Sequence, residues 1–544
     1  RRRVAGAAIA TLRAGGTTQG ASTITMQLAR NVFPDVLPPR ERTFDRKLRE
    51  MHVARSMEAM LPKDSILQHY LNTIYLGAGA YGVDAAARAY FGKQVGEVTL
   101  AEAALLAALP QRPSASNPFR RPEAALARRN VVLARMRDLG WITLEAWETA
   151  RATPLQLARD PSSEGGLATE AATGPYFLEE VRRDLQRTLG PALYRGGYRI
   201  HTTLDAAVQD SAERILDSAL VAIEGGSLGA RPRPARAEVE PTDLRLSTTA
   251  YLQAGVAILD VDSGDVRALI GGRSFRESPF NRMTQAWRQP GSAFKPFIYA
   301  AALEHGWAPD DLVSDAPIAV PRPGGIVWRP QNFNPREVNG AVTLEEALAR
   351  SLNRATVRLG MQVGLGRVLG TAEAMGLSGP LPRVPAVLLG SADVHPIDLV
   401  AAYAVIARND GQRVRPRLVT RVTDARGRVM LSRAPRIDPA IAPEVASALR
   451  GLLEATITHP RGTGGNVRRR GYEGPVAGKT GTTNGTTNTW FIGVTPDLAA
   501  GVWVGFDQPR AILPDTTATG GRVAAPIWAE IMRRVPAVRG RWPE

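Results

Sequence analysis

The spacing of apolar residues divides the chain into two kinds of sequence. From residue 1 to about residue 160, apolar side chains recur every three or four positions in Ala-rich segments, a period typical of amphipathic helices. Examples are DRKLREMHVARSMEAML, KDSILQHYLNTIYLG and LAEAALLAAL, the last of which ends at Pro110. We therefore predict a mostly helical first domain over residues 1–160.

A passage rich in Ser, Gly and Thr, PSSEGGLATEAATGP, then predicts a linker. It is followed by a helical pattern in FLEEVRRDLQRTLG, a short strand in YRIHTTLD and a further helical run that ends near Glu224. The next segment, GGSLGARPRPARAEVEPT, has the Pro and Gly content of a loop. We assign residues 161–249 to an interdomain linker region.

The pattern changes after residue 250. In AGVAILDVDSGDVRALIGG, two apolar strands flank the turn sequence DSGD, and TWFIGVTPDLAAGVWVGFD predicts a second strand-turn-strand unit. Helical patterns between them include SAFKPFIYAAALEHG and VTLEEALARSLN, and another, APIWAEIMRRV, follows the late strands. We predict one α+β domain over residues 250–537, whose sheet joins early and late strands, and a tail over 538–544.

Charge and composition narrow the possible partners. The chain carries 68 Lys and Arg against 52 Asp and Glu, a formal charge of +16, which favours an anionic partner. We see no basic run interleaved with aromatic residues, so we do not expect a nucleic acid. The six histidines lack metal-ligand spacing and there are no cysteines, so the residues alone predict no metal site. The longest apolar run near the start, VAGAAIATL, is half of what a membrane span requires.

Lysine is rare among the basic residues. Five of the 68 are lysines, namely Lys47, Lys63, Lys93, Lys295 and Lys479. This bias makes arginine the default cation, so a position that keeps lysine is one where arginine does not substitute. Because lysine can release its proton and arginine cannot, these positions are candidates for proton-transfer chemistry.

The segment GSAFKPF places a hydroxyl beside an amine. Ser292 and Lys295 lie three apart, so on a helix their side chains share a face. A buried lysine with a lowered pKa can deprotonate a serine, and a serine at the start of a helix has free backbone N–H groups nearby for an oxyanion. Taken alone, the pattern is weak, because chance matches are common and a surface serine and lysine are the more frequent explanation.

Two further short motifs follow in order. Ser351 and Asn353 lie after an amphipathic helix, where a hydroxyl and an amide can pass a proton and bind a peptide amide. Further on, Lys479 and Thr480 on an edge strand can hold a carboxylate, and Gly481 lets a peptide backbone approach. By itself the first means little, and the second is also compatible with a Gly-rich loop.

The three motifs in this order resemble those of penicillin-binding proteins and class A β-lactamases. The longer stretches RQPGSAFKPFIYAAALEHG, PQNFNPREVNGAVTLEEALARSLN and VAGKTGTTN resemble a class A, bifunctional penicillin-binding protein. The resemblance implies a multidomain chain. Its second part is expected to be an α+β penicillin-binding, β-lactamase-like transpeptidase domain with an antiparallel sheet.

The resemblance also implies a role for each motif residue. Ser292 is expected to attack the bond between two terminal D-alanines of a peptidoglycan stem peptide, with Lys295 as its base, and β-lactams to acylate the same serine. The remaining implied roles are an oxyanion hole from the N–H groups of Ser292 and Thr482, proton transfer by Ser351, amide binding by Asn353, and carboxylate binding by Lys479 and Thr480 with Gly481 beside them.

The first domain carries a second resemblance. QGASTITMQLARN, RKLRE, KDSILQHYLNTIYLG and AEAALLAALPQRPSASNP resemble successive motifs of a lysozyme-like, mostly helical peptidoglycan glycosyltransferase. The family's contacts to the pyrophosphate and sugars of lipid II match Thr23, Gln27, Arg30, Arg46 and Lys47, and its second acidic residue matches Glu50. Cations beside a carboxylate suit a pyrophosphate, either directly or through a divalent ion such as Mg²⁺. Solvated charge pairs on a helix remain the simpler alternative for Arg46 and Glu50.

The sequence departs from the glycosyltransferase pattern in three ways. Met26 stands where the family usually has a glutamine, and Gln68 stands where a glutamate is common. The family's first motif, with the glutamate that deprotonates the acceptor, should lie before Arg1 and after a transmembrane anchor. We therefore expect residues 1–544 alone not to polymerise glycan, whereas the full-length protein should.

The partners expected from the resemblance are lipid II, nascent peptidoglycan, β-lactams, the cytoplasmic membrane through an N-terminal anchor, and cell-wall regulators. The expected location is the periplasmic face of that membrane, and no cofactor is expected for the transpeptidase. Two alternatives stay open: a hydrolase, either a D,D-carboxypeptidase or a β-lactamase, and a non-catalytic penicillin-binding scaffold. A β-lactamase is disfavoured because no ExxLN lies between Asn353 and Lys479.

Overall fold

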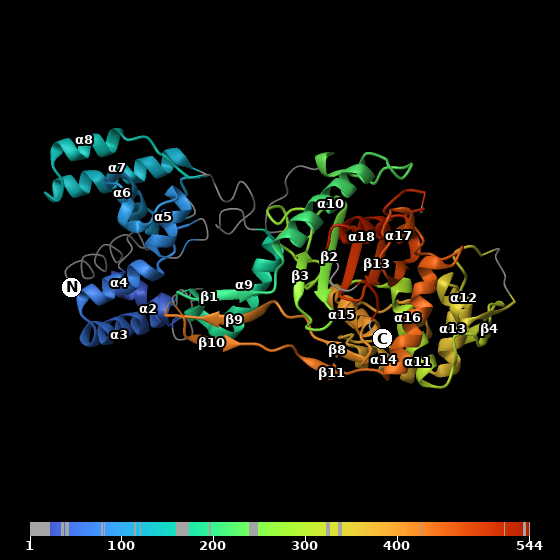
Figure 1. Ribbon diagram of the computed structural model, residues 1–544. Helices are drawn as coiled ribbons and strands as arrows, with labels where there is room; N and C mark the ends of the chain where they lie inside the picture. Colours follow the sequence, from blue (N-terminus) through green and yellow to red (C-terminus); the bar gives the residue numbers. More distant parts are fainter. Residues whose placement is uncertain are drawn as a thin grey trace. The chain divides into compact units, whose positions relative to one another are not determined.

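The computed structural model describes residues 22–33, 37, 43–77, 80, 82–111, 113, 116–119, 121–158, 173–194, 197–238, 248–321, 327–335, 340–424, 426–515, 517–536 and 540–542. The chain forms two compact units (Figure 1). Unit 1 comprises Arg1–Ala172 and Leu185–Tyr198, and unit 2 comprises Thr173–Asp184 and Arg199–Glu544. The predicted domain limits at 160 and 537 fall outside the described residues, so they stay predictions, as does the limit at 249.

Unit 1 is helical where it is described, as predicted. Its main helices are α2 (Ile24–Val32), α3 (Phe44–Met60), α4 (Lys63–Thr73), α5 (Val83–Phe91), α6 (Leu100–Ala108), α7 (Pro122–Asp138) and α8 (Leu144–Ala152). Threonine side chains begin several of them by accepting a backbone N–H, and Thr23 and Thr43 do so for α2 and α3. Small and aromatic residues of α2, α4, α5 and α6 pack into one core, in which Leu28, Tyr90 and Leu105 are fully buried.

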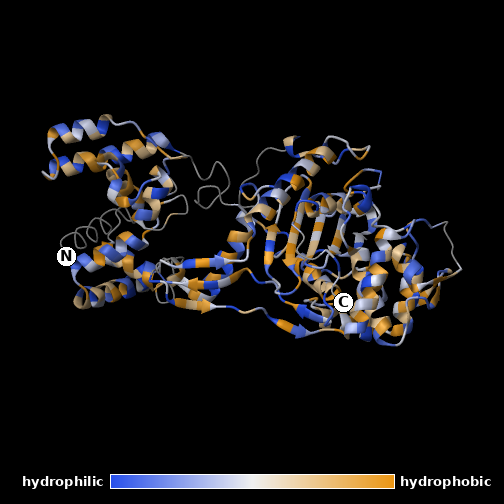
Figure 2. Cartoon of the chain, in the orientation of Figure 1, coloured by the Kyte–Doolittle hydropathy of each residue, from blue (hydrophilic) through white to orange (hydrophobic). Residues whose placement is uncertain are grey.

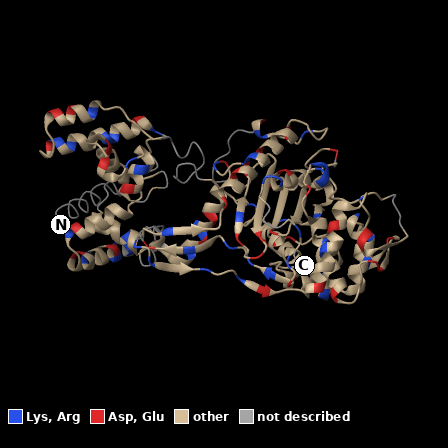
Figure 3. Cartoon of the chain, viewed as in Figure 1, with Lys and Arg blue, Asp and Glu red and all other residues tan. Residues whose placement is uncertain are grey.

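The centre of unit 2 is a five-stranded antiparallel sheet in the order β12-β13-β14-β2-β3. The strands are β2 (Gln253–Asp260), β3 (Val266–Ile270), β12 (Ala477–Thr482), β13 (Asn488–Val494) and β14 (Leu498–Gly505). Because β14 pairs with β2, the early hairpin joins the late one, as predicted. Figure 2 shows apolar residues along these strands, and Figure 3 shows few charges on them.

The two faces of the sheet pack against different helices. On one face, Phe491 of β13 meets Trp528 of α18 (Ala524–Met532), and α10 (Ala206–Glu224) extends this core. On the other face, a Cβ on Gly501 would collide with Val400 of α15 (Pro396–Ala407). Lys479 is in cross-strand register with Ile492, which is in register with Gly501, so the Lys479 side chain lies on the α15 face.

The other helices of unit 2 are α9 (Pro175–Leu189), which crosses the unit limit, and α11 (Lys295–Glu304), α12 (Leu344–Ala349), α13 (Asn353–Val363), α14 (Leu365–Met375), α16 (Pro443–Thr458) and α17 (Asn466–Arg469). The prediction of one helix through VTLEEALARSLN is wrong in one respect. The helix ends at Ala349 and a new one begins at Asn353, because Ser351 adopts a left-handed backbone with φ 57°.

The sequence pattern does not predict several short strands. They are β4 (Leu312–Ser314), β5 (Val320–Pro321), β6 (Val327–Trp328), β7 (Ala341–Thr343), β8 (Gln412–Val414), β9 (Val419–Thr423), β10 (Val429–Ser432) and β11 (Ile437–Pro439). The strand predicted in YRIHTTLD is present as β1 (Arg199–Thr202) and pairs with β9, far along the chain. Within the described residues, the helices are too short or too polar to span a membrane.

Candidate active sites

Ser292 lies in a 3₁₀ turn, Gly291–Phe294, that leads directly into α11. In such a turn residues three apart are eclipsed, so Ser292 and Lys295 emerge on the same side. Gly291 has φ 54°, and a Cβ there would lie 2.5 Å from the Thr482 carbonyl oxygen. Glycine therefore lets the turn rest against the end of β12, and the Tyr403 hydroxyl holds the turn by donating to the Ala293 carbonyl at 2.7 Å.

Lys295 joins the first two motifs. Its side chain is fully buried, and Nζ lies 2.7 Å from the Ser351 carbonyl oxygen, 3.1 Å from Ser351 Oγ and 2.7 Å from Asn353 Oδ1. The left-handed backbone at Ser351 turns both its carbonyl and its hydroxyl toward this amine. The structure thus brings together residues separated by more than fifty positions in the sequence.

The surroundings of Lys295 favour a neutral amine. Burial holds the pKa of Lys295 well below its usual range, and the charge of Lys479 lowers it further, whereas Asp315 raises it. Nζ donates to the Ser351 carbonyl, the Ser351 hydroxyl and Asn353 Oδ1, and all three of these partners are uncharged. The amine therefore has hydrogen-bond partners but no carboxylate bonded to it that would favour its charged form.

Lys479 lies on β12, the edge strand next to Ser292. Burial lowers the pKa of its ammonium to about 7, and Nζ lies 3.2 Å from the Thr480 carbonyl oxygen. A Cβ on Gly481 would collide with the Pro290 carbonyl, so glycine allows the 3₁₀ turn and the strand to approach each other. Thr482 Oγ1 accepts from the Gly520 N–H at 3.0 Å, which ties the end of the strand to the following loop.

Thr463 and Gln331 belong to none of the three motifs, but both contact residues of the site. The Thr480 hydroxyl donates to Thr463 Oγ1 at 2.9 Å, and the Thr463 N–H donates to the Ala349 carbonyl at 3.1 Å. Thr463 therefore links β12 to the end of α12. The Gln331 carbonyl accepts from Asn353 Nδ2 at 2.7 Å. Gln331 lies within one of the stretches that resemble the family, whereas Thr463 has a generic sequence neighbourhood, so long-range contact is the only signal for Thr463.

In unit 1, Glu50 is the centre of a charged cluster. It is fully buried, and its two oxygens accept from Arg46 at 3.1 Å and from Lys47 at 3.2 Å. Lys47 also donates to Ser22 Oγ at 2.7 Å, which connects α3 to the start of α2. The alternative of solvated charge pairs does not fit Glu50, because its carboxylate is buried and its two cationic partners are only partly exposed.

The candidate residues on and beside α2 have two different sets of partners. Thr23 caps the helix and lies next to Ser22, the residue bonded to Lys47. Gln27 accepts instead from the Tyr70 hydroxyl of α4 at 2.9 Å. Burial raises the pKa of Tyr70, and the charge of Arg30 opposes that shift, so Gln27 and Arg30 both act on the same tyrosine. Tyr70 was missed as a candidate although it lies within one of the resembling segments.

The two departures in this unit have different surroundings. Met26 is buried on α2, where its side chain belongs to the interior, whereas Gln68 is exposed on α4. Among the described residues, no group of three or more His, Asp or Glu side chains is arranged to hold a metal ion. Both Glu50 oxygens are already bonded to cations, so the residues do not fit a Mg²⁺ held by the protein alone.

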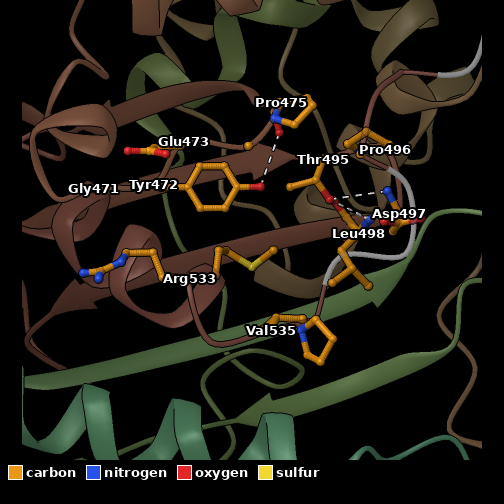
Figure 4. A pocket seen from close by; sticks show the side chains of 14 residues that line it. Gly471, Tyr472, Glu473, Pro475, Thr495, Pro496, Asp497, Leu498, Arg533 and Val535 are labelled. Carbon is orange, nitrogen blue, oxygen red and sulfur yellow. Dashed lines mark hydrogen bonds between the residues drawn. The ribbon is translucent and has the colours of Figure 1, made fainter.

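A cavity of about 350 Å³ in unit 2 lies away from the Ser292 site. Figure 4 shows it between the β13–β14 turn, with Thr495 and Leu498, and the end of α18, with Arg533. Tyr472 borders it and donates to the Pro475 carbonyl at 3.4 Å. The cavity lies at the end of β13 near Thr495. The opposite end of β13 begins near Thr489, which pairs with Thr482 beside the Ser292 turn, so the cavity is not the Ser292 site.

Comparison with family models divides the chain in the same way as the motifs. Residues 1–137 match the model described as Transglycosylase, and residues 254–533 match the one described as Penicillin binding protein transpeptidase domain. The first match contains the Glu50 cluster and the second contains all three motifs around Lys295.

Known proteins resemble the chain along most of its length. Penicillin-binding protein 1A of Aquifex aeolicus is 35% identical over 590 residues, covering 97% of this chain and 78% of that protein. The Neisseria cinerea protein of the same name is 32% identical, covering 97% of this chain and 75% of that protein.

Among solved structures, penicillin-binding protein 1A from Haemophilus influenzae matches with a TM-score of 0.69 and 25% identity over 94% of this chain and 87% of that one. The PonA1 protein from Mycobacterium tuberculosis in complex with penicillin V matches with a TM-score of 0.55 and 26% identity, covering 68% and 95%.

Proposed function

Because the chain belongs to the class A penicillin-binding proteins, we propose that Ser292 is the residue at which its acyl-enzyme forms. The protein is a bifunctional enzyme of cell-wall synthesis, with peptidoglycan glycosyltransferase and serine D,D-transpeptidase activities, and it binds β-lactams. The observation that carries the residue assignment is the buried Lys295, bonded to both Ser351 and Asn353 beside the Ser292 turn.

In the proposed acylation, neutral Lys295 accepts the Ser292 proton while Oγ attacks the carbonyl between the two D-alanines. The N–H groups of Ser292 and Thr482 stabilise the oxyanion, a role supported by the close approach of Gly291 to Thr482. Collapse breaks the C–N bond, and Ser351 passes a proton to the leaving D-alanine. The acyl group stays on Ser292 until the amine of a second stem peptide displaces the enzyme.

The other motif residues are proposed to hold the donor peptide. Asn353 binds its amide, and Lys479 with Thr480 binds the terminal carboxylate, while Gly481 keeps the strand edge open beside them. A carboxylate next to Lys479 favours its ammonium form and so raises its pKa from about 7 when substrate binds. The two lysines then differ in charge: Lys295 is neutral as the base and Lys479 is positive as the anion site.

Mapping a penicillin adduct tests this assignment. Proteolysis and mass spectrometry of the labelled protein are expected to place the adduct on Ser292, and an adduct on another residue contradicts the site. Incubation with a stem peptide and an amine acceptor then separates transpeptidase from D,D-carboxypeptidase. Crosslinked product supports the first, whereas release of D-alanine with hydrolysed donor alone supports the second.

For unit 1 we propose that Arg46 and Lys47 contact the lipid II pyrophosphate, with Glu50 as an acidic residue of the site. Thr23, which caps α2, and Arg30 with Gln27 extend the contacts along this helix. Because both Glu50 oxygens already accept from cations, direct contact between the cations and the pyrophosphate is the simpler arrangement, and a divalent ion would have to arrive with the substrate. Isothermal titration of a soluble lipid II analogue, with and without Mg²⁺, tests this.

We also propose that the enzyme acts on the periplasmic face of the cytoplasmic membrane, held there by an N-terminal anchor, with cell-wall regulators among its partners and no nucleic acid. The support is chemical, because lipid II and nascent peptidoglycan are found on that face. Fractionation of cells that express the full-length protein, with protease added to the outside of spheroplasts, tests the location. Protection of the catalytic units from protease contradicts it.

A further inference from the structure

The helix that carries Asn353 begins without a local cap. Leu352 occupies the N-cap position of α13, and its apolar side chain cannot accept a hydrogen bond from the first turn. The neighbouring positions, Ser351 and Asn353, instead direct their side chains to Lys295. The first N–H groups of α13 therefore need acceptors from elsewhere in the fold.

Two buried residues from distant segments supply those acceptors. Asn332 Oδ1 accepts from the N–H groups of Asn353 at 2.8 Å and Arg354 at 3.2 Å, and Asp315 Oδ1 accepts from Ala355 at 3.2 Å. Asn332 Nδ2 in turn donates to Asp315 Oδ2 at 2.8 Å, which joins the two side chains. Asp315 is fully buried and Asn332 is 5% exposed, so this is an interior connection.

We propose that Asp315 and Asn332 are positioning residues for acylation, forming a cap from distant segments that holds Asn353 and Ser351 against Lys295. The proposal rests on the assigned role of Lys295 as the base. Asp315 follows β4 and Asn332 lies in the loop after β6, so the cap ties two separate segments to the start of α13. Its negative charge also suits the positive end of a helix.

The charge of Asp315 also affects the pKa of Lys295. The charged groups that act on Lys295 are Lys479, which lowers its pKa, and Asp315, which raises it. Tyr299 on α11 and Tyr403 on α15 have pKa values raised by burial, so both stay neutral beside the site. Removal of the Asp315 charge should therefore lower the pKa of Lys295, an effect that loss of helix capping alone does not produce.

The test compares acylation by fluorescent penicillin across pH for the wild type, Asp315→Asn, Asn332→Ala and a matched control, Asp310→Asn. Asp310 is an exposed aspartate five residues before Asp315. We expect Asp315→Asn and Asn332→Ala to reduce the plateau rate of acylation by about 10- to 100-fold, because Asn353 and Ser351 are no longer held in position against Lys295. Asp315→Asn alone should also move the acidic limb to lower pH, whereas Asp310→Asn should match the wild type.

Further variants keep the outcomes distinct. Asn332→Ala leaves the charge of Asp315 in place. If thermal unfolding shows that Asp315→Asn does not fold, the plateau rate of Asn332→Ala tests the proposal. The exchange of both residues, Asp315→Asn with Asn332→Asp, restores acceptors for α13 and is expected to recover part of the plateau rate. Wild-type plateau rates in both single variants overturn the proposal. Labelling that persists in Ser292→Ala overturns the site assignment instead, whatever the Asp315 variants do.

Discussion

The cations of the two candidate sites have opposite kinds of partner. In unit 1, Arg46 and Lys47 donate to the two oxygens of Glu50, so each positive charge has a carboxylate partner. In unit 2, Lys295 donates to carbonyl, hydroxyl and amide oxygens, and the charged group with the largest effect on its pKa is another lysine, Lys479. A paired cation keeps its charge for an anionic substrate, whereas a desolvated lysine without a carboxylate at its amine releases its proton. Environment thus separates the proposed anion site from the proposed base.

The sites also differ in how the chain assembles them. The Glu50 cluster comes from adjacent turns of α3 and from the start of α2, and its main contacts are three and four residues apart. The Lys295 site collects α11, the α12–α13 turn and β12, which are far apart in the sequence. The first depends on local helix geometry and the second on tertiary packing, so they should respond differently to substitution.

Lys295→Arg should cause the largest change. Arginine keeps the positive charge but cannot act as a base, so the rate of acylation by penicillin should fall by about 10²- to 10⁴-fold. Fluorescent penicillin labelling measures it, and Lys93→Arg in unit 1 serves as the matched control. Undiminished labelling of Lys295→Arg contradicts the role of the amine.

The pH dependence of acylation should show two limbs of opposite sign. As pH rises, Lys295 loses its proton and the rate increases, because the base must be neutral. Above the pKa of Lys479, about 7 without substrate, the ammonium that binds a carboxylate is lost and the rate falls, by about tenfold per pH unit at most. Stopped-flow measurement with a penicillin tests this, and Lys479→Ala should remove the alkaline limb. An alkaline limb that survives in this variant assigns it to another group.

Arg46→Ala and Lys47→Ala should weaken binding in unit 1 while acylation in unit 2 stays unchanged. Each removes a charge-assisted contact to pyrophosphate, for which we expect a loss of about 10-fold in affinity for a lipid II analogue, less at high salt. Lys93→Ala is the control, because Lys93 pairs with Glu102 outside the cluster. Equal affinity of all three variants rules out the cluster as the pyrophosphate site.

Glu50→Gln should destabilise unit 1. The neutral side chain leaves Arg46 and Lys47 without their charged partner, and both are only partly exposed, so we expect a loss of about 1–3 kcal/mol in the free energy of unfolding. Calorimetry should show it as a lower melting temperature of the transition that belongs to unit 1. An unchanged transition contradicts a buried pairing at Glu50.

Thr463→Val should have the smallest effect. It removes the acceptor of the Thr480 hydroxyl but keeps the backbone bond to Ala349, so β12 stays in place while Thr480 loses its fixed orientation. We expect a rise of about 3- to 10-fold in KM for a carboxylate-bearing donor, with kcat nearly unchanged. Thr458→Val, on the exposed end of α16, is the control.

Much of this arrangement follows from sequence, and the exceptions have physical causes. Apolar runs on either side of a turn sequence are sufficient to predict both hairpins of the central sheet, and the resemblance names Ser292, Lys295 and Lys479. β1 and β9 form a pair whose members are too short to be distinctive and too distant to predict each other. The break at Ser351 was missed because helical periodicity continues through it while the backbone does not.

The supporting residues are the hardest to find in the sequence. Asp315, Asn332 and Thr463 have common side chains, and their importance comes from partners 17 to 114 residues away. Their positions become meaningful only when the fold brings them to the start of α13 and the edge of β12. Motifs therefore identify the chemistry, and packing identifies what holds it in place.

The titration of the Lys295 amine tests the central claim most directly. The chain has only five lysines, so ¹³C-labelled lysine gives five Cε signals, and the Lys295 signal is the one that disappears in Lys295→Arg. We predict that this signal titrates well below 10.5, the ordinary value for lysine. A titration at or above that value means that Lys295 is charged at neutral pH, and it contradicts the proposed base.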